Sequence, residues 1–304
     1  MLDKLKQGVR NIFTSEKYEQ FLKVYSKFHD YSINNTILIL MQNPESSHVA
    51  SYQTWKKLGR NINKGAKGIK VLVPIPYKYQ KRVEKIDMNG KRKTEDIDLR
   101  GMSFRLGNVF DISQTDGTEL PKLTTELADN SDEIKRAIDM VVKTSPVPIY
   151  YDKPVGKANG FYHLEDKYIA IRLGMSDSQT FKTLVHEITH AKLHASYERK
   201  ICCKKAKMTT NDNRVQHKPA SRAEQEIQAL SVAFLVCSKY GIDTSEYSFG
   251  YIAGWSSDKD TKELKSSLDT ISKCSDEITK AIDKELGVKS IDQIAKKKDR
   301  VMER

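Results

Sequence analysis

Residues 180–194 read TFKTLVHEITHAKLH, and the pentapeptide HEITH at 186–190 is the most informative stretch of the chain. Residues four apart on an α-helix lie about one turn apart on the same face, so His186 and His190 can both reach one metal ion. Glu187 would then lie beside the open side of that ion, where its carboxylate can accept a proton from water. This spacing is typical of zinc hydrolases and predicts a metallopeptidase-like site.

The residues around this motif predict a helix that is largely buried. Its apolar positions are Phe181, Leu184, Val185, Ile188 and Leu193. Unpaired ionisable groups are costly to bury, so two histidines and a glutamate on such a helix need partners. A chance match on a solvated helix is the alternative, and these flanks make it the weaker interpretation.

The third ligand has to come from elsewhere in the chain, because catalytic zinc usually keeps three protein ligands and one open position. His194 follows on the same helix, but a straight helix cannot bring three histidines onto one ion. We therefore expect His194 to be structural or to support a ligand. In RAEQEIQALSVAF (222–234), Glu226 is favoured over Glu224, and small Ala229 allows a close approach of the two helices. For either acid, a solvated position on the helix surface is the alternative.

Composition narrows the class of protein. The 304 residues suggest two domains, and a formal charge of +12 with a pI near 9.3 favours polyanionic partners. No run of eighteen apolar residues occurs, so we expect no membrane span. The N-terminus lacks the apolar core of a secretion signal. The four cysteines have no CxxC spacing, which predicts reduced thiols and a cytoplasmic location.

The pattern of elements predicts an α+β protein of two domains. We expect a basic α+β domain at 1–120, a polar linker at 121–131, a second domain at 132–257, and a charged helix with a tail at 258–304. In the second domain the motif helix should pack on a small antiparallel sheet, and the strand at 168–173 could pair with an extended substrate. A charged hairpin is expected around Asn89-Gly90 and a polar loop at 199–221.

The first domain carries a candidate surface for single-stranded nucleic acid. Such surfaces combine basic side chains that follow the phosphates with aromatic rings on which bases stack. The candidate residues are Tyr52, Trp55, Lys56, Lys57, Arg60, Lys64, Lys67 and Lys70. Glycines at 65 and 68 would let backbone amides approach a phosphate. The alternatives are core packing for Trp55 and an ordinary solvated face for the lysines.

Several blocks of the chain resemble a known family. YSINN (31–35), QNP (42–44), YQTWKKLGR (52–60), KGAKGI (64–69) and VFDISQT (109–115) resemble the N-terminal domain of ArdC-type antirestriction proteins. HEITHAKLH, the EIQA helix and YIAGW (251–255) resemble the metallopeptidase domain that follows it, which is similar to the ImmA/IrrE class of zinc peptidases. These blocks cover roughly residues 10–260 in the family's order.

The resemblance implies a single-stranded-DNA-binding domain and a gluzincin-like domain, in a protein of plasmids and conjugative elements that protects incoming DNA from host restriction. One Zn²⁺ ion would be held by His186, His190 and Glu226, with Glu187 as the general base. Relatives commonly have an acid at the position of Leu230, where it could hydrogen-bond a metal ligand. Leucine cannot form that hydrogen bond. The alternatives are a site-specific peptidase that cleaves a repressor-like protein and a non-catalytic DNA-binding shield with a structural metal.

Overall fold

The computed structural model describes residues 2–13, 15–28, 31–86, 92–120, 126–127, 129, 131–152, 158–195, 220–250, 252–289, 291 and 293–295. Its helices are α1 (Leu2–Ile12), α2 (Ser15–Lys27), α3 (Ile33–Gln42), α4 (Tyr52–Lys57), α5 (Asp132–Lys143), α6 (Asp177–Leu193), α8 (Arg222–Lys239), α9 (Ile252–Ser256) and α10 (Thr261–Leu286), with a 3₁₀ turn, η1 (Ile112–Gln114). Its strands are β1 (Val49–Ala50), β2 (Arg60–Ile62), β3 (Ile69–Ile86), β4 (Arg92–Asp111), β5 (Thr115–Gly117), β6 (Ile149–Asp152), β7 (Gly160–His163) and β8 (Tyr168–Arg172). The chain is therefore α+β, as the sequence predicts.

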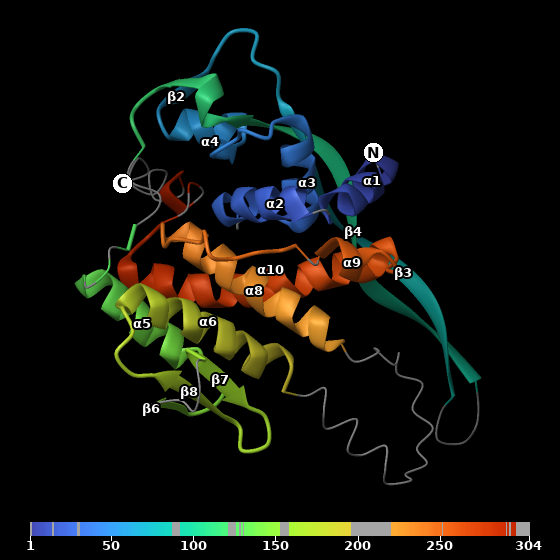
Figure 1. Cartoon of the computed structure of the whole chain (residues 1–304). Helices are drawn as coiled ribbons and strands as arrows, with labels where there is room; N and C mark the ends of the chain where they lie inside the picture. The colour runs from blue at the N-terminus through green and yellow to red at the C-terminus, as the bar shows by residue number, and fades with distance from the viewer. Residues whose placement is uncertain are drawn as a thin grey trace.

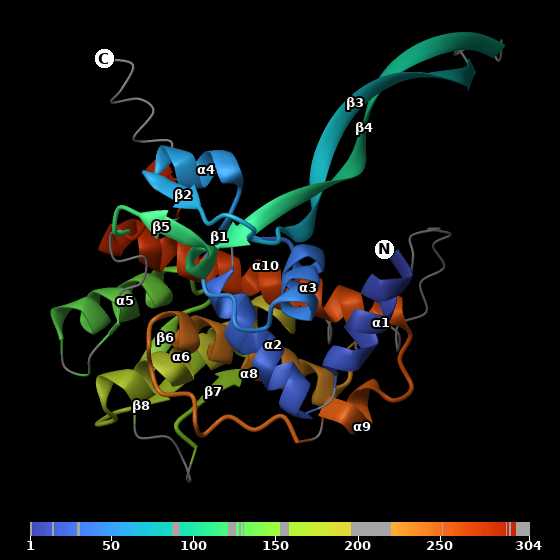
Figure 2. The ribbon, with the colours of Figure 1, turned by 90° about the horizontal axis from the view of Figure 1, so that it is seen from above.

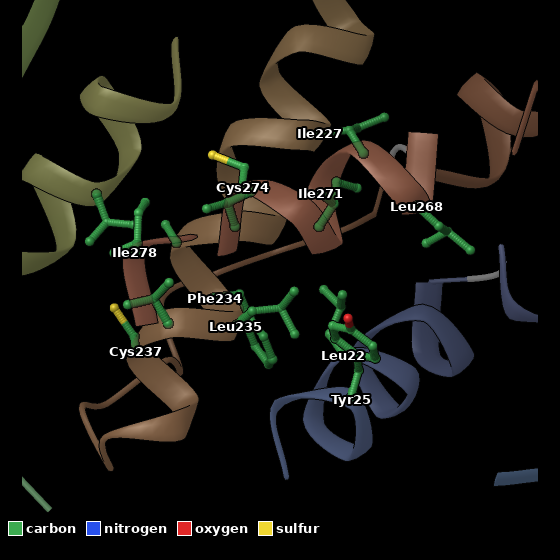
Figure 3. Close-up of a cluster of buried hydrophobic side chains, with 14 of the residues drawn as sticks. Leu22, Tyr25, Ile227, Phe234, Leu235, Cys237, Leu268, Ile271, Cys274 and Ile278 are labelled. Atoms are coloured by element: carbon green, nitrogen blue, oxygen red, sulfur yellow. The ribbon is translucent and has the colours of Figure 1, made fainter. Parts of the chain in front are cut away.

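The main core is built by helices from both ends of the chain. Figure 1 shows α8 and α10 lying between α2 on one side and α5 with α6 on the other. One continuous buried cluster contains side chains of α1, α2 and α3 as well as of α5, α6, α8 and α10. In Figure 3, Leu22 and Tyr25 of α2 lie beside Leu235 of α8 and Leu268 of α10. The N-terminal helices thus share a core with the motif helix, and the domain borders at 120 and 132 stay a prediction.

The charged C-terminal helix, α10, is a core element. Asp260 begins it with a capping box to Glu263, and Gly287 ends it in the left-handed conformation at φ 68°. Its apolar positions recur at helical spacing, so one face is buried while lysines and acids occupy the other. The predicted basic tail beyond residue 295 lies outside the described residues.

Two sequence-based expectations about the sheet of the second domain are wrong. The strand order is β6–β8–β7, with β6 parallel and β7 antiparallel to β8, so the sheet is mixed. Because β8 is hydrogen-bonded on both sides, its backbone cannot pair with a substrate, whereas β7 lies at the edge. Alternation of side chains predicts that a segment is a strand, but it contains no information about direction or neighbours.

Strands β3 and β4 form a long antiparallel arm, which projects from the body next to α3 (Figure 2). At its base, Ile69, Val71 and Val109 pack against Phe28 and Ile39. β1 extends the pairing through Ala50 and Phe110. The charged hairpin predicted from the sequence is thereby confirmed, while its expected turn at Asn89-Gly90 lies outside the described residues.

Two further expectations concern the membrane and the thiols. None of the described helices combines the length and apolar content that a bilayer crossing requires. Cys237 and Cys274 are free and buried, and burial raises the pKa of the Cys237 thiol to about 12. Cys202 and Cys203, like most of the polar loop predicted at 199–221, lie outside the described residues.

Candidate metal centre and the N-terminal basic face

Helix α6 holds the two motif histidines on one face. Ser176 caps its N-terminus by accepting a hydrogen bond from the Gln179 backbone, and apolar residues bury the side that faces the core. His186 and His190 lie one turn apart and point toward α8, because α6 and α8 pack against each other along their lengths. The packing of these two helices therefore sets the distance between the two imidazole rings and the side chains of α8 that face them.

Glu226 of α8 completes a group of three donors. The Nε2 atoms of His186 and His190 are 3.2 Å apart, and each lies 3.7 Å from a carboxylate oxygen of Glu226. All three donor atoms lie within 4.8 Å of one another. Ligand atoms about 2.0–2.1 Å from a tetrahedral zinc ion are about 3.3 Å apart, so this spacing fits one such ion. Two imidazoles and a carboxylate are also donors that zinc prefers.

The protonation of the histidines suits metal binding. Burial lowers the pKa of His186 to about 3, with a further contribution from His190 and His194. Burial also lowers the pKa of His190 to about 4. Both rings are therefore neutral near pH 7, and each has a nitrogen lone pair for a cation.

Glu187 lies next to the three donors without belonging to them. Burial raises the pKa of its carboxyl group to about 7, with the negative charge of Glu226 adding to the effect. The backbone N–H of Tyr162 on β7 donates a hydrogen bond to the Glu187 carboxylate and opposes this shift. A carboxylate with a pKa near 7 can both accept and return a proton at neutral pH, as a general base requires.

A cavity of about 270 Å³ opens beside Glu187 and His186. Its other lining residues are Asn159, Gly160, Gln179, Lys182, Thr183, Leu230, Glu246 and Tyr247. Leu230 occupies the position where relatives commonly carry a second acid, and here it contributes an apolar wall. The cavity reaches the first residue of the edge strand β7, Gly160, so a chain bound there could reach Glu187 from that side.

His194 does not join the three donors but contacts one of them. Its Nδ1 lies 3.0 Å from Nδ1 of His190, and its Nε2 lies 3.1 Å from Oε1 of Gln228. Since an amide oxygen only accepts, His194 carries its proton on Nε2, and its Nδ1 then accepts from the Nδ1–H of His190. That tautomer leaves Nε2 of His190 with its lone pair directed at Glu226 and His186. The Gln228 amide in turn donates to Oγ of Ser267 at 3.1 Å.

The structure separates the two acids that the sequence left open. Glu226 lies with the histidines, whereas Glu224 Oε1 lies 3.5 Å from the Gln228 amide nitrogen, one turn along α8. The two side chains point in different directions because residues two apart on a helix differ by about 200°. Glu224 is thus placed to orient Gln228, not to bind the same ion.

In the N-terminal region, two of the predicted DNA-contacting residues are used by the fold. Trp55 is fully buried, and its indole N–H donates to the carbonyl of Phe110 at 2.8 Å. Arg60 donates to the Thr115 carbonyl and hydroxyl and to the Thr118 carbonyl at 2.7–2.8 Å, which joins β2 to β5. Trp55 has no exposed ring face on which a base could stack, so that part of the prediction is wrong, whereas a contact of half-buried Arg60 with DNA stays a prediction.

The other candidate residues remain accessible. Tyr52 is 55% exposed, and the five lysines at 56, 57, 64, 67 and 70 are all exposed. They lie on α4, on the turn before β3 and at the start of β3. Their role in DNA binding stays a prediction, and their exposure makes them accessible to a phosphate.

Residues 1–110 match the family model described as the N-terminal domain of anti-restriction factor ArdC. This region is an ArdC-type domain. The chain is also 25% identical to an uncharacterized protein of Bacillus anthracis, pXO2-81, over 94% of its own length and 51% of that protein. It thus spans about half the length of the curated relative it matches.

Crystal structures of the antirestriction ArdC protein from plasmid R388 are similar as well. The metal-free structure is 22% identical and covers 83% of each chain, with a TM-score of 0.44. The Mn(II)-bound structure is 19% identical and covers 82% of this chain and 84% of that one, also with a TM-score of 0.44.

Sequence reasoning missed Gln228 and Ser267, which orient His194 beside the metal centre. A glutamine and a serine on separate helices have no spacing that links them to the HEITH motif, so only the packing of α10 against α8 brings them together. In the ArdC-type domain, the burial of Trp55 depends on strand β4, which follows about fifty residues later. The spacing of three residues between Trp55 and Leu58 could have indicated this burial, because it puts both apolar side chains on one helix face, and both are buried.

Proposed function

We propose that this chain is an antirestriction-type protein of a mobile genetic element, which binds single-stranded DNA and carries a zinc metallopeptidase-like site. The observation that carries the second part is the convergence of His186, His190 and Glu226 within 4.8 Å, directly beside Glu187. The ArdC-type domain and its exposed lysines support the first part. Both halves belong to one molecule, because helices of the ArdC-type domain share a core with α8 and α10.

The donor set would hold Zn²⁺ through two neutral imidazoles and the Glu226 carboxylate. When bound, zinc supplies Lewis acidity toward a carbonyl oxygen and lowers the pKa of water. Glu187 would accept the proton of the attacking water and return it to the leaving amine, which its pKa near 7 allows. The edge strand β7 would align an extended peptide by backbone pairing, with side chains directed into the cavity beside Gln179 and Lys182.

A second candidate function is a site-specific peptidase that acts on a regulatory protein and uses the basic face only for localisation. The cavity next to Glu187 favours it, because a shield with a purely structural metal needs neither a cavity nor a general base. Glu187 and the cavity therefore separate an enzyme from a non-catalytic shield, and a variant at Glu187 is the test.

The test combines three measurements on the purified full chain: metal content, binding of labelled oligo-deoxythymidine, and cleavage of a peptide library. We expect one zinc ion per chain in the wild type and in Glu187→Gln, with peptide cleavage only in the wild type. Strand binding should be equal in both. Absence of metal from the wild type would contradict the metal site, and cleavage by Glu187→Gln would contradict the role of the general base. If the wild type binds metal but cleaves no peptide, the function that remains is the non-catalytic DNA-binding shield with a structural metal.

A further inference from the structure

The middle of the β3–β4 arm exposes large side chains that nothing in the described structure covers. We call the paired stretches 73–79 and 99–105 the arm midsection. Phe104 is 59% exposed, Met102 55%, Tyr77 48% and Tyr79 43%. An isolated two-stranded ribbon has no core of its own, so these side chains do not stabilise the arm by burial. An exposed apolar cluster of this kind marks a binding surface.

The two tyrosines are held as a pair on one face of the arm. Residues two apart in a strand share a face, and the ring centroids of Tyr77 and Tyr79 are 5.7 Å apart. Tyr77 lies over Gly101 on the opposite strand, where a Cβ atom would come within 2.4 Å of Cζ of the ring. The glycine thus makes room for the ring against the backbone, and the outer face of the ring stays open.

The same stretch is positively charged, and the next acid along the arm, Asp98, accepts a hydrogen bond from Gln80 at 3.0 Å. The stretch contains Lys78, Arg100 and Arg105 and no acidic residue. Lys78 and Arg100 are directly opposite each other, and a cross-strand pair of like charges is destabilising. Neither has an ionic partner among the described residues, in contrast to Arg82 nearer the tip, which pairs with Asp96 at 2.9 Å. An anion bound between Lys78 and Arg100 would relieve this repulsion.

We propose that the arm midsection binds single-stranded DNA through both faces of the ribbon. Bases stack on Tyr77 and Tyr79 on the face that also carries Arg105, and on Phe104 on the opposite face, where Lys78 and Arg100 hold phosphates. This inference rests on the proposed function and deepens it. Aromatic rings with cations nearby suit a single strand because only unpaired bases can stack on them. Since Trp55 is buried, Tyr52 is the one exposed ring among the candidate residues of the basic face, and the arm adds further rings for stacking. Three cations without an acid favour a polyanion over a protein partner.

The position of the arm agrees with this assignment. At its base, exposed Lys70 continues the row formed by Lys64 and Lys67 on the turn before β3. Figure 2 shows the arm leaving the body on the side where α3 and α4 lie. A strand on the arm midsection could therefore run onto the lysines of the ArdC-type domain without crossing the metal centre.

The experiment measures fluorescence anisotropy of labelled oligo-deoxythymidine with the full chain over a range of salt. Tyr77→Leu/Tyr79→Leu keeps strand-compatible side chains and should weaken binding about tenfold or more, since it removes two stacked bases. Tyr77→Phe/Tyr79→Phe should bind like the wild type. Lys78→Gln/Arg100→Gln should reduce the slope of log affinity against log salt by about 1.4, at about 0.7 per lost phosphate contact.

Matched controls remove an exposed ring or two exposed cations elsewhere. Tyr150→Leu on β6 and Lys262→Gln/Lys280→Gln on α10 should leave affinity and slope unchanged. If the wild type binds and the arm variants, with unchanged melting curves, bind equally well, the arm inference is overturned while the proposed function stands. If the wild type does not bind single strands, the proposed function fails first. Loss of self-association instead of DNA binding in the tyrosine variant would assign the surface to a second copy of the chain and overturn the inference.

Discussion

The Nδ1 atoms of His190 and His194 lie 3.0 Å apart, so the last histidine of HEITHAKLH orients the second one. Gln228 accepts from the other side of the His194 ring, which fixes the direction of both hydrogen bonds. The result is a chain of hydrogen bonds from His190 through His194 to Gln228, which leaves the lone pair of His190 Nε2 directed toward the candidate metal site. Residues that hold a ligand in this way commonly affect metal affinity about as strongly as a weak ligand does.

Removing the acceptor at His194 should weaken metal binding without unfolding the protein. His194→Phe keeps a flat ring of similar size but cannot accept from His190. We expect the zinc affinity to fall about 10–100-fold, measured by competition with a chelating dye. Thr189→Val on the same helix is the control, because the Thr189 hydroxyl donates to the Val185 carbonyl at 2.7 Å and bonds to the Cys274 thiol, and does not bond to the histidines. Equal affinity in His194→Phe and wild type would show that the orientation of His190 has another cause.

The choice of the third ligand can be tested on α8. Glu226→Gln should release most of the metal at micromolar zinc, because the amide has no negative charge with which to bind the cation. Glu224→Gln should retain it, and Glu187→Gln should as well. Elemental analysis after gel filtration measures all three. The assignment would be reversed by a Glu224→Gln protein that is purified metal-free beside a metal-loaded Glu226→Gln protein.

The metal-free protein should lose stability in acid. Burial lowers the pKa of His186 to about 3 and those of His190 and His194 to about 4, from about 6.5 in the unfolded chain. Below about pH 6.5 the unfolded state therefore binds up to three more protons at these sites. Glu187 opposes this by one proton, since its folded pKa of about 7 lies above its unfolded value. The net difference of about two protons gives a slope of up to about 2–3 kcal/mol per pH unit.

Urea unfolding in the presence of a chelator at about pH 7, 6 and 5 measures this slope. His186→Asn/His190→Asn removes two of the three groups and should flatten or reverse the dependence, because Glu187 then balances the remaining histidine. An acid dependence as steep in that variant as in the wild type would mean that other groups, such as His48, control the acid response. Burial lowers the pKa of His48 as well.

Trp55 should matter for stability and not directly for DNA. Trp55→Ala removes a fully buried ring and leaves the Phe110 carbonyl without its donor, so we expect a loss of about 3–5 kcal/mol in the free energy of unfolding. Tyr52→Ala, one turn earlier and exposed, should change it by about 0.5 kcal/mol or less. Chemical denaturation measures both. A fully stable Trp55→Ala protein with weakened strand binding would restore the original assignment of this ring to the DNA surface.

A buried ion pair between α8 and α10 should contribute to the stability of the core. Asp283 accepts from Lys239 at 2.5 Å and from the Tyr240 hydroxyl at 2.8 Å, and the Lys239 side chain is 3% exposed. Asp283→Ala leaves the ammonium group buried without its carboxylate, which should lower the free energy of unfolding by about 3–5 kcal/mol. Glu285→Ala, two residues later and exposed, is the control and should have little effect.

The sequence alone was sufficient for features that depend on local geometry. The helical repeat places His186 and His190 on one face whatever surrounds them, so the metal motif could be recognised without a structure. The charged stretch around Asn89-Gly90 likewise predicted a hairpin, since pairing of adjacent strands follows from a short connection, whereas its continuation over β3 and β4 came from the structure. The blocks in residues 31–115 pointed to the ArdC-type domain for a similar reason, because they are contiguous in the chain.

Tertiary packing decided what depends on distant segments. The rotation of α8 about its own axis against α6 places Glu226, and not Glu224, with the two histidines, whereas small Ala229 in RAEQEIQALSVAF gave only a preference for that rotation. The burial of Trp55 depends on Phe110, which follows 55 residues later, and the pairing of β8 on both sides depends on where β6 and β7 lie. Periodicity records which face of an element is apolar, but it contains no information about which partner covers that face. For that reason the pair of candidate His ligands could be predicted from the chain and Glu226 favoured as the third, whereas the position of Glu226, the orienting Gln228 and the exposed rings of the arm required the fold.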